Sequence, residues 1–127
     1  MKKFALVSLV IFGLVACFKQ KSPFEQVLEI KLPNWAAFNS GSPEGKKAGW
    51  AAILKLNEIC VSINPKVQKV TGQEGDAALV VGALILSQVE KAQKRFAEMS
   101  ADKKAEFLAA EDKRLPGECV GAFGSTK

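Results

Sequence analysis

The sequence of 127 residues contains no histidine. Histidine is the commonest general base in enzymes, the usual partner of nucleophilic serine and cysteine, and the usual ligand of catalytic zinc. The sequence also lacks a CxxC redox motif and any glycine-rich loop of the phosphate-binding type. Its three cysteines are too few for a structural zinc site. We therefore predict a protein that is not an enzyme and that holds neither a cofactor nor a metal ion.

Clustered basic residues are missing as well. The net charge is +5 at pH 7, but the lysines and arginines are distributed along the chain. A nucleic-acid-binding protein concentrates such residues on one face or in one segment. We therefore predict no nucleic-acid partner and interpret the basic side chains as an ordinary solvated surface.

One tetrapeptide matches part of a catalytic motif. Residues 100–103, which read Ser-Ala-Asp-Lys, are similar to the S-x-x-K motif of penicillin-binding proteins and β-lactamases, in which the lysine assists the serine one helical turn away. The companion S-D-N and K-T-G elements of those proteins are missing, and the chain is too short for their fold. We interpret Ser100 as a helix cap that is followed by solvated charges.

The N-terminus has the organisation of a secretion signal. Lys2 and Lys3 precede an apolar segment at residues 4–13, and the small Ala16 stands directly before Cys17. The apolar segment is shorter than the ~20 residues that a membrane-spanning helix requires. This pattern, with Leu-Val-Ala-Cys at residues 14–17, resembles the signal peptide and lipobox of bacterial lipoproteins.

The resemblance to lipoproteins implies a modification and a location. It implies that residues 1–16 are removed, that Cys17 carries the lipid as the first mature residue, and that residues 17–21 are a spacer. The mature protein would then be lipid-anchored, through palmitate or similar chains, to a membrane of the cell envelope. Phe18 replaces the aspartate that is associated with inner-membrane retention in many Gram-negative bacteria, so the outer membrane is favoured in such an envelope.

Two cysteines remain after the lipidated one. Cys60 and Cys119 would lie outside the cytoplasm, where an even number of remaining thiols usually forms disulfides. The alternative is that each cysteine is buried separately and packs as a small hydrophobic residue. We predict the disulfide, which would stabilise the fold by about 4 kcal/mol in the chain-entropy model.

The remainder of the chain has the periodicity of helices. Apolar residues recur at intervals of three and four, and Ser-Pro or serine cap signals precede several of these segments. The fold class that we predict is all-α, a compact bundle of four or five helices in one domain, residues 22–120, followed by a flexible tail at 121–127. The predicted helices cover residues 23–32, 43–63, 73–99 and 101–115, with a single further turn near Val67 and Val70.

One predicted helix is apolar nearly all round in its first half. Residues 77–86 contain ten consecutive apolar residues between Asp76 and Ser87. Such a segment is typical of a helix in the centre of a bundle. We therefore expect Val81, Ile85 and the residues that follow at helical spacing to form a core stripe.

Aromatic residues occur where a loop is expected. Residues 33–42 have a loop composition, yet they include Trp35 and Phe38. These side chains either fill the interior of the bundle or face the bilayer near the anchor. Together with Trp50 they are the candidate partner contacts, since tryptophan often provides binding energy at interfaces.

Two functional hypotheses follow. The first is a membrane-anchored helical lipoprotein that acts as a non-catalytic protein-binding or structural module, with an unknown envelope protein as its partner. The alternative is a carrier or binder of an apolar ligand or lipid. The second hypothesis requires a cavity of about 300 Å³ or more between the helices.

Overall fold

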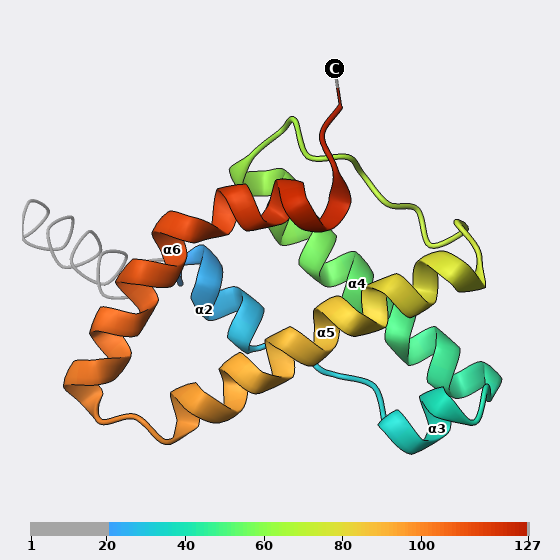
Figure 1. Ribbon diagram of the computed structural model, residues 1–127, viewed down its shortest axis with the longest axis horizontal. Helices are drawn as coiled ribbons and strands as arrows, with labels where there is room; N and C mark the ends of the chain where they lie inside the picture. The colour runs from blue at the N-terminus through green and yellow to red at the C-terminus, as the bar shows by residue number, and fades with distance from the viewer. Residues whose placement is uncertain (1–20, 127) are drawn as a thin grey trace, which may run out of the picture.

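The computed structural model describes residues 21–126 of the chain. Within this range the chain forms five helices and no strand, which confirms the predicted all-α bundle (Figure 1). The helices are α2 (Pro23–Leu28), α3 (Trp35–Asn39), α4 (Pro43–Ile63), α5 (Asp76–Ala97) and α6 (Ala101–Phe123). The predicted signal peptide and the predicted lipidation site, Cys17, lie outside the described residues.

Serine residues cap three of the helices, as the sequence predicts. The hydroxyl oxygen of Ser22 accepts a hydrogen bond from the backbone of Glu25, and the Glu25 side chain accepts one from Ser22 in return. Ser42 caps α4 and Ser100 caps α6 in the same way, each through the backbone N–H three residues later. These bonds satisfy N–H groups that have no partner within the helix.

Three predicted local structures are wrong. The expected loop at residues 33–42 contains the short helix α3, which Asn34 caps. No helical turn forms at Val67, which is fully buried in an extended segment. The helix predicted from residue 73 begins at Asp76 instead, because the Glu74 carboxylate closes a turn by accepting bonds from the Thr71 backbone and hydroxyl. The Thr71 backbone hydrogen bond is the main cause that holds the pKa of Glu74 below its ordinary value.

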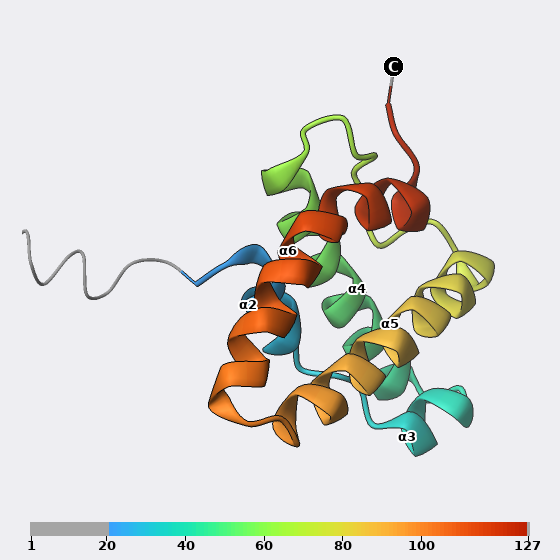
Figure 2. The same ribbon diagram turned by 60° about the vertical axis from the view of Figure 1, so that its left-hand side comes forward.

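The last helix extends well beyond its predicted end at residue 115. α6 continues through Pro116 to Phe123, and Figure 1 shows that it bends along its length. A proline inside a helix removes one backbone hydrogen bond and commonly causes such a bend. Beyond the helix, Ser125 pairs with Val67, and the Thr126 backbone N–H donates to the Lys66 carbonyl. The C-terminal segment therefore packs against the extended segment that follows α4 (Figure 2).

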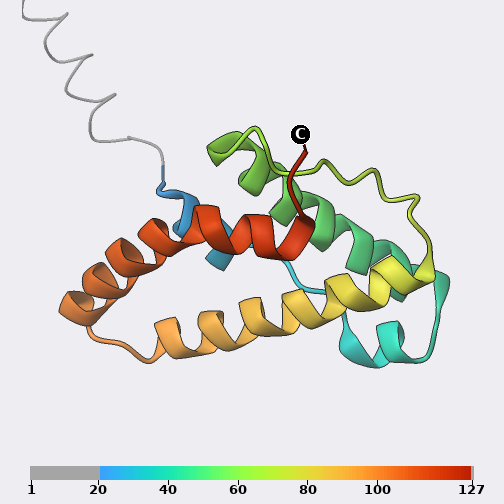
Figure 3. The ribbon, with the colours of Figure 1, turned by 45° about the horizontal axis from the view of Figure 1, so that its top comes forward.

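The hydrophobic core surrounds α4, which contacts each of the other four helices. α5 and α6 form a helical hairpin that turns at Met99 and Ser100 (Figure 3). Within the described residues the core extends from Phe24 to Cys119. The core consists of Phe24, Val27, Ile30, Ala52, Ile53, Leu56, Ile59, Cys60, Val67, Leu79, Leu86, Val89, Leu115 and Cys119.

Candidate functional site

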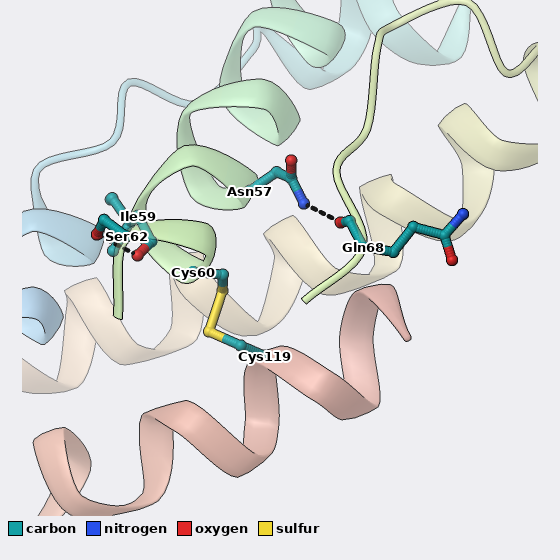
Figure 4. The surroundings of a disulfide bond; sticks show 6 residues. All are labelled: Asn57, Ile59, Cys60, Ser62, Gln68 and Cys119. Atoms are coloured by element: carbon teal, nitrogen blue, oxygen red, sulfur yellow. Dashed lines mark hydrogen bonds between the residues drawn. A yellow bond between two sulfur atoms is a disulfide. The ribbon is translucent and has the colours of Figure 1, made fainter. Parts of the chain in front are cut away.

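The two remaining cysteines form the predicted disulfide. The sulfur atoms of Cys60 and Cys119 lie 2.06 Å apart, and both residues are only 1% exposed (Figure 4). The bond joins the end of α4 to the second half of α6 across the core. Because neither sulfur is accessible, the pair has a structural role and offers no reactive thiol.

The three aromatic candidates pack against the core. The indole N–H of Trp35 donates to the Glu90 carboxylate at 3.2 Å, and the ring makes an edge contact with Phe38 at 5.6 Å between centroids. Phe38 in turn lies over Gly49, where the absence of a side chain admits its ring. Trp35, Phe38 and Trp50 are each partly buried. Each side chain packs one side against the core and leaves the rest exposed. Their use as partner contacts stays a prediction.

The predicted burial of the first half of α5 is wrong on one side. Val80, Val81 and Leu84 are 57%, 56% and 66% exposed, the largest exposure of any large hydrophobic residue in the described range. The opposite side of the helix packs on α4, where Gly82 lies against Ile53. No described element covers the exposed side. We call Val80, Val81 and Leu84 the α5 apolar face.

A cleft of about 430 Å³ lies between α5 and α6, and α2 and α4 form its floor. We call it the α5–α6 cleft. It exists because the two helices of the hairpin touch each other little, and the smaller helix α2 lies against both. Its lining is mostly apolar and includes Phe24, Val27, Leu56, Val89, Phe107 and Leu115.

Five charged side chains border the α5–α6 cleft. Lys91 and Arg95 extend from α5, one helical turn apart. Glu111 of α6 is 8% exposed and pairs with Arg114, so its charge is compensated within the protein. Glu118 lies further along α6 and is exposed. No local pattern in the sequence predicts this arrangement, because the hairpin brings together residues that are far apart in the chain.

The S-x-x-K tetrapeptide has no catalytic geometry. The Ser100 hydroxyl accepts the backbone N–H of Lys103 at 3.4 Å, which is a capping bond. The Lys103 ammonium points to Glu106, at 4.0 Å, and both side chains are largely exposed. The structural interpretation of these residues is therefore confirmed.

Searches for other kinds of site give negative results for residues 21–126. No three acidic or cysteine side chains in this range gather as metal ligands do. Among the described helices, none combines the length and the apolar character that crossing a bilayer demands. Comparison with protein-family models, with curated proteins and with solved structures finds no match to this chain.

Proposed function

We propose that this protein is a lipid-anchored, non-catalytic binding module of the bacterial cell envelope, and that it docks on an envelope protein through the α5 apolar face. The observation that carries the proposal is the exposure of Val80, Val81 and Leu84 on one side of a single helix. Contiguous apolar side chains on a soluble domain commonly mark an interaction surface.

The chemistry of the α5 apolar face favours a protein partner. Valine side chains have few rotamers, so little conformational entropy is lost when they are covered. The face lies on a long helix that packs on α4 and is therefore a rigid surface. A partner that fits it presents an apolar surface of similar size, such as the side of another helix.

The proposed anchor makes a small interface sufficient. Residues 18–21 separate the proposed lipid on Cys17 from the capping Ser22, and four extended residues span at most about 14 Å. A domain held so near the membrane encounters envelope proteins at a high effective concentration. A contact that is weak in solution is then occupied most of the time.

Photocrosslinking in intact cells tests this proposal. A photoreactive residue at position 80 of the full chain should give one adduct with an envelope protein, and Leu84→Asp should abolish that adduct. Because Leu84 is mostly exposed, this substitution should leave thermal unfolding unchanged. The control substitution Ala109→Asp, on the exposed side of α6, should leave the adduct intact.

Three crosslinking results would contradict the proposal. Capture of lipid alone at position 80 would assign the α5 apolar face to the bilayer. Capture of only a second copy of this chain would assign it to self-association. The same adduct from a photoreactive residue at the exposed Lys113 would show that the contact is not specific to this face.

A second candidate function is favoured by the α5–α6 cleft. Its volume of about 430 Å³ exceeds the ~300 Å³ at which cavities begin to hold small ligands. Its floor is formed by core residues that remain reachable from the cleft, including Phe24 and Leu115. Binding of an apolar or amphipathic molecule in the α5–α6 cleft is compatible with docking through the α5 apolar face, which lies elsewhere on α5.

A further inference from the structure

We infer that the α5–α6 cleft binds a single-chain fatty acid, with the carboxylate at Arg95 and Lys91 and the hydrocarbon chain on the apolar floor. This inference rests on the second candidate function and names its ligand class. It depends on three properties of the cleft, which are its volume, its apolar floor and the distribution of its charges.

The volume of the cleft suits a small apolar ligand. At about 430 Å³ it lies within the range of cavities that hold small molecules. A single hydrocarbon chain is much narrower than a helix and fits a cleft of this size.

The apolar lining is long enough to hold most of an extended acyl chain. Ile85 and Arg95 both line the cleft, and ten helical steps of 1.5 Å between them give about 15 Å. Between these ends the lining includes Val27 from α2, Leu56 from α4 and Leu115 from α6. Methylene groups of a ligand that pack against these side chains are removed from water, which favours a long chain.

The charged side chains are distributed unevenly between the two ends of the cleft. The Arg95 guanidinium lies 5.8 Å from the centroid of the Phe107 ring, which holds it at the hairpin end. Lys91 is one turn away on the same helix. Of the two carboxylates in the lining, Glu111 is paired with Arg114, and Glu118 is eleven residues beyond Phe107, about 16 Å along α6. An anionic head is therefore attracted to the hairpin end and repelled from the other.

Arginine and lysine differ in what they offer to this head group. A guanidinium can donate two parallel hydrogen bonds to one carboxylate, whereas an ammonium acts as a point charge. Arg95 is the residue that we expect to set the position of the carboxylate. Lys91 adds attraction without fixing the geometry.

Equilibrium dialysis with radiolabelled palmitate tests the inference. Residues 18–127, oxidised and without the lipid, include every described core residue and, once circular dichroism shows them helical, should bind one palmitate per chain. Lys91→Gln/Arg95→Gln should weaken binding about tenfold or more, because both charge-assisted contacts are lost. Lys47→Gln/Lys113→Gln removes the same charge away from the cleft and should leave binding unchanged.

Two further measurements separate the failure of this inference from that of the second candidate function. Ala92→Trp fills the cleft and should abolish binding of palmitate and of the neutral hexadecanol alike. If hexadecanol binds as tightly as palmitate, or if both glutamine double variants weaken binding equally, the charge assignment is wrong while the cleft remains a ligand site. If neither molecule binds at all, both the inference and the second candidate function are refuted.

Discussion

Gly45 lets two helices approach more closely than any other residue would allow. A Cβ atom at this position would lie 2.5 Å from both the carbonyl carbon of Ala37 and the backbone nitrogen of Phe38. Backbone atoms cannot move aside as the end of a side chain can. We therefore expect Gly45→Ala to lower the free energy of unfolding by about 2 kcal/mol, measured by urea denaturation.

A second glycine supplies the control for this substitution. Gly117 lies inside α6, and no heavy atom lies within 4 Å of the position that its Cβ would take. Gly117→Ala should stabilise the protein by up to about 1 kcal/mol, because alanine has the higher helix propensity. If the two variants change stability in the same direction, steric contact with α3 is not what requires glycine at position 45.

Asn57 shows what a pattern of apolar residues cannot predict. It lies among the buried residues of α4 and is 2% exposed, although it is polar. Its side-chain amide donates to the Gln68 carbonyl at 2.9 Å (Figure 4). Its oxygen accepts from the Val70 backbone, also at 2.9 Å. These bonds add to the bridge between Val67 and Ser125 in holding the extended segment on the fold. A polar residue within an apolar stripe was the available signal, but its partners depend on the fold.

At the scale of the helices, the disulfide connects two elements that otherwise touch over a short length. Cys60 and Cys119 are 59 residues apart in the sequence. Crosslinking a loop of this length removes entropy from the unfolded chain, worth about 4 kcal/mol. We expect Cys60→Ala/Cys119→Ala to lose about this amount of stability in urea denaturation, with alanine chosen because a buried serine would add an unpaired hydroxyl.

Reduction provides an independent check on the same bond. Dithiothreitol should lower the stability of the unmodified residues 18–127 to that of the double alanine variant and should leave the variant itself unaffected. Equal stability of the oxidised protein and the variant would show that the crosslink adds nothing to the folded state.

The helix beginnings could be predicted from the sequence because capping is local. Ser22, Ser42 and Ser100 each bond within three residues, so the signal and its structural result lie in the same short segment. The pairing of Cys60 with Cys119 could be predicted for a different reason. With Cys17 assigned to the lipid, only one connection remained.

The errors occur where the result depends on distant parts of the chain. α5 is apolar on all sides between residues 77 and 86, so periodicity could not identify the side that α4 would leave uncovered. The predicted end of α6 at Pro116 was wrong because the disulfide at Cys119 and the packing of Phe123 hold the following turns in place. These interactions offset the roughly 3 kcal/mol that an interior proline costs.

At the scale of the whole molecule, one helix contributes to both proposed surfaces. The α5 apolar face uses the first half of α5, and the α5–α6 cleft uses Ile85, Lys91 and Arg95 from the middle and second half. The disulfide lies beneath the cleft and joins α4 in its floor to α6 at one side. Both proposals therefore concern a rigid surface and neither requires a change of conformation.

The location of the protein depends on Cys17, and its chemistry can be tested directly. The full chain produced in a bacterium that processes lipoproteins should yield a mature species that begins at Cys17 and carries acyl chains, identified by intact mass spectrometry. Several acyl chains hold a protein firmly, whereas one holds it weakly, so this species should sediment with membranes and resist high salt. Cys17→Ala should abolish acylation and membrane attachment while leaving the fold of residues 21–126 unchanged, because the described core begins at Phe24. A chain that retains Met1 and carries no acyl group would refute the anchor, and the argument from effective concentration would be lost with it.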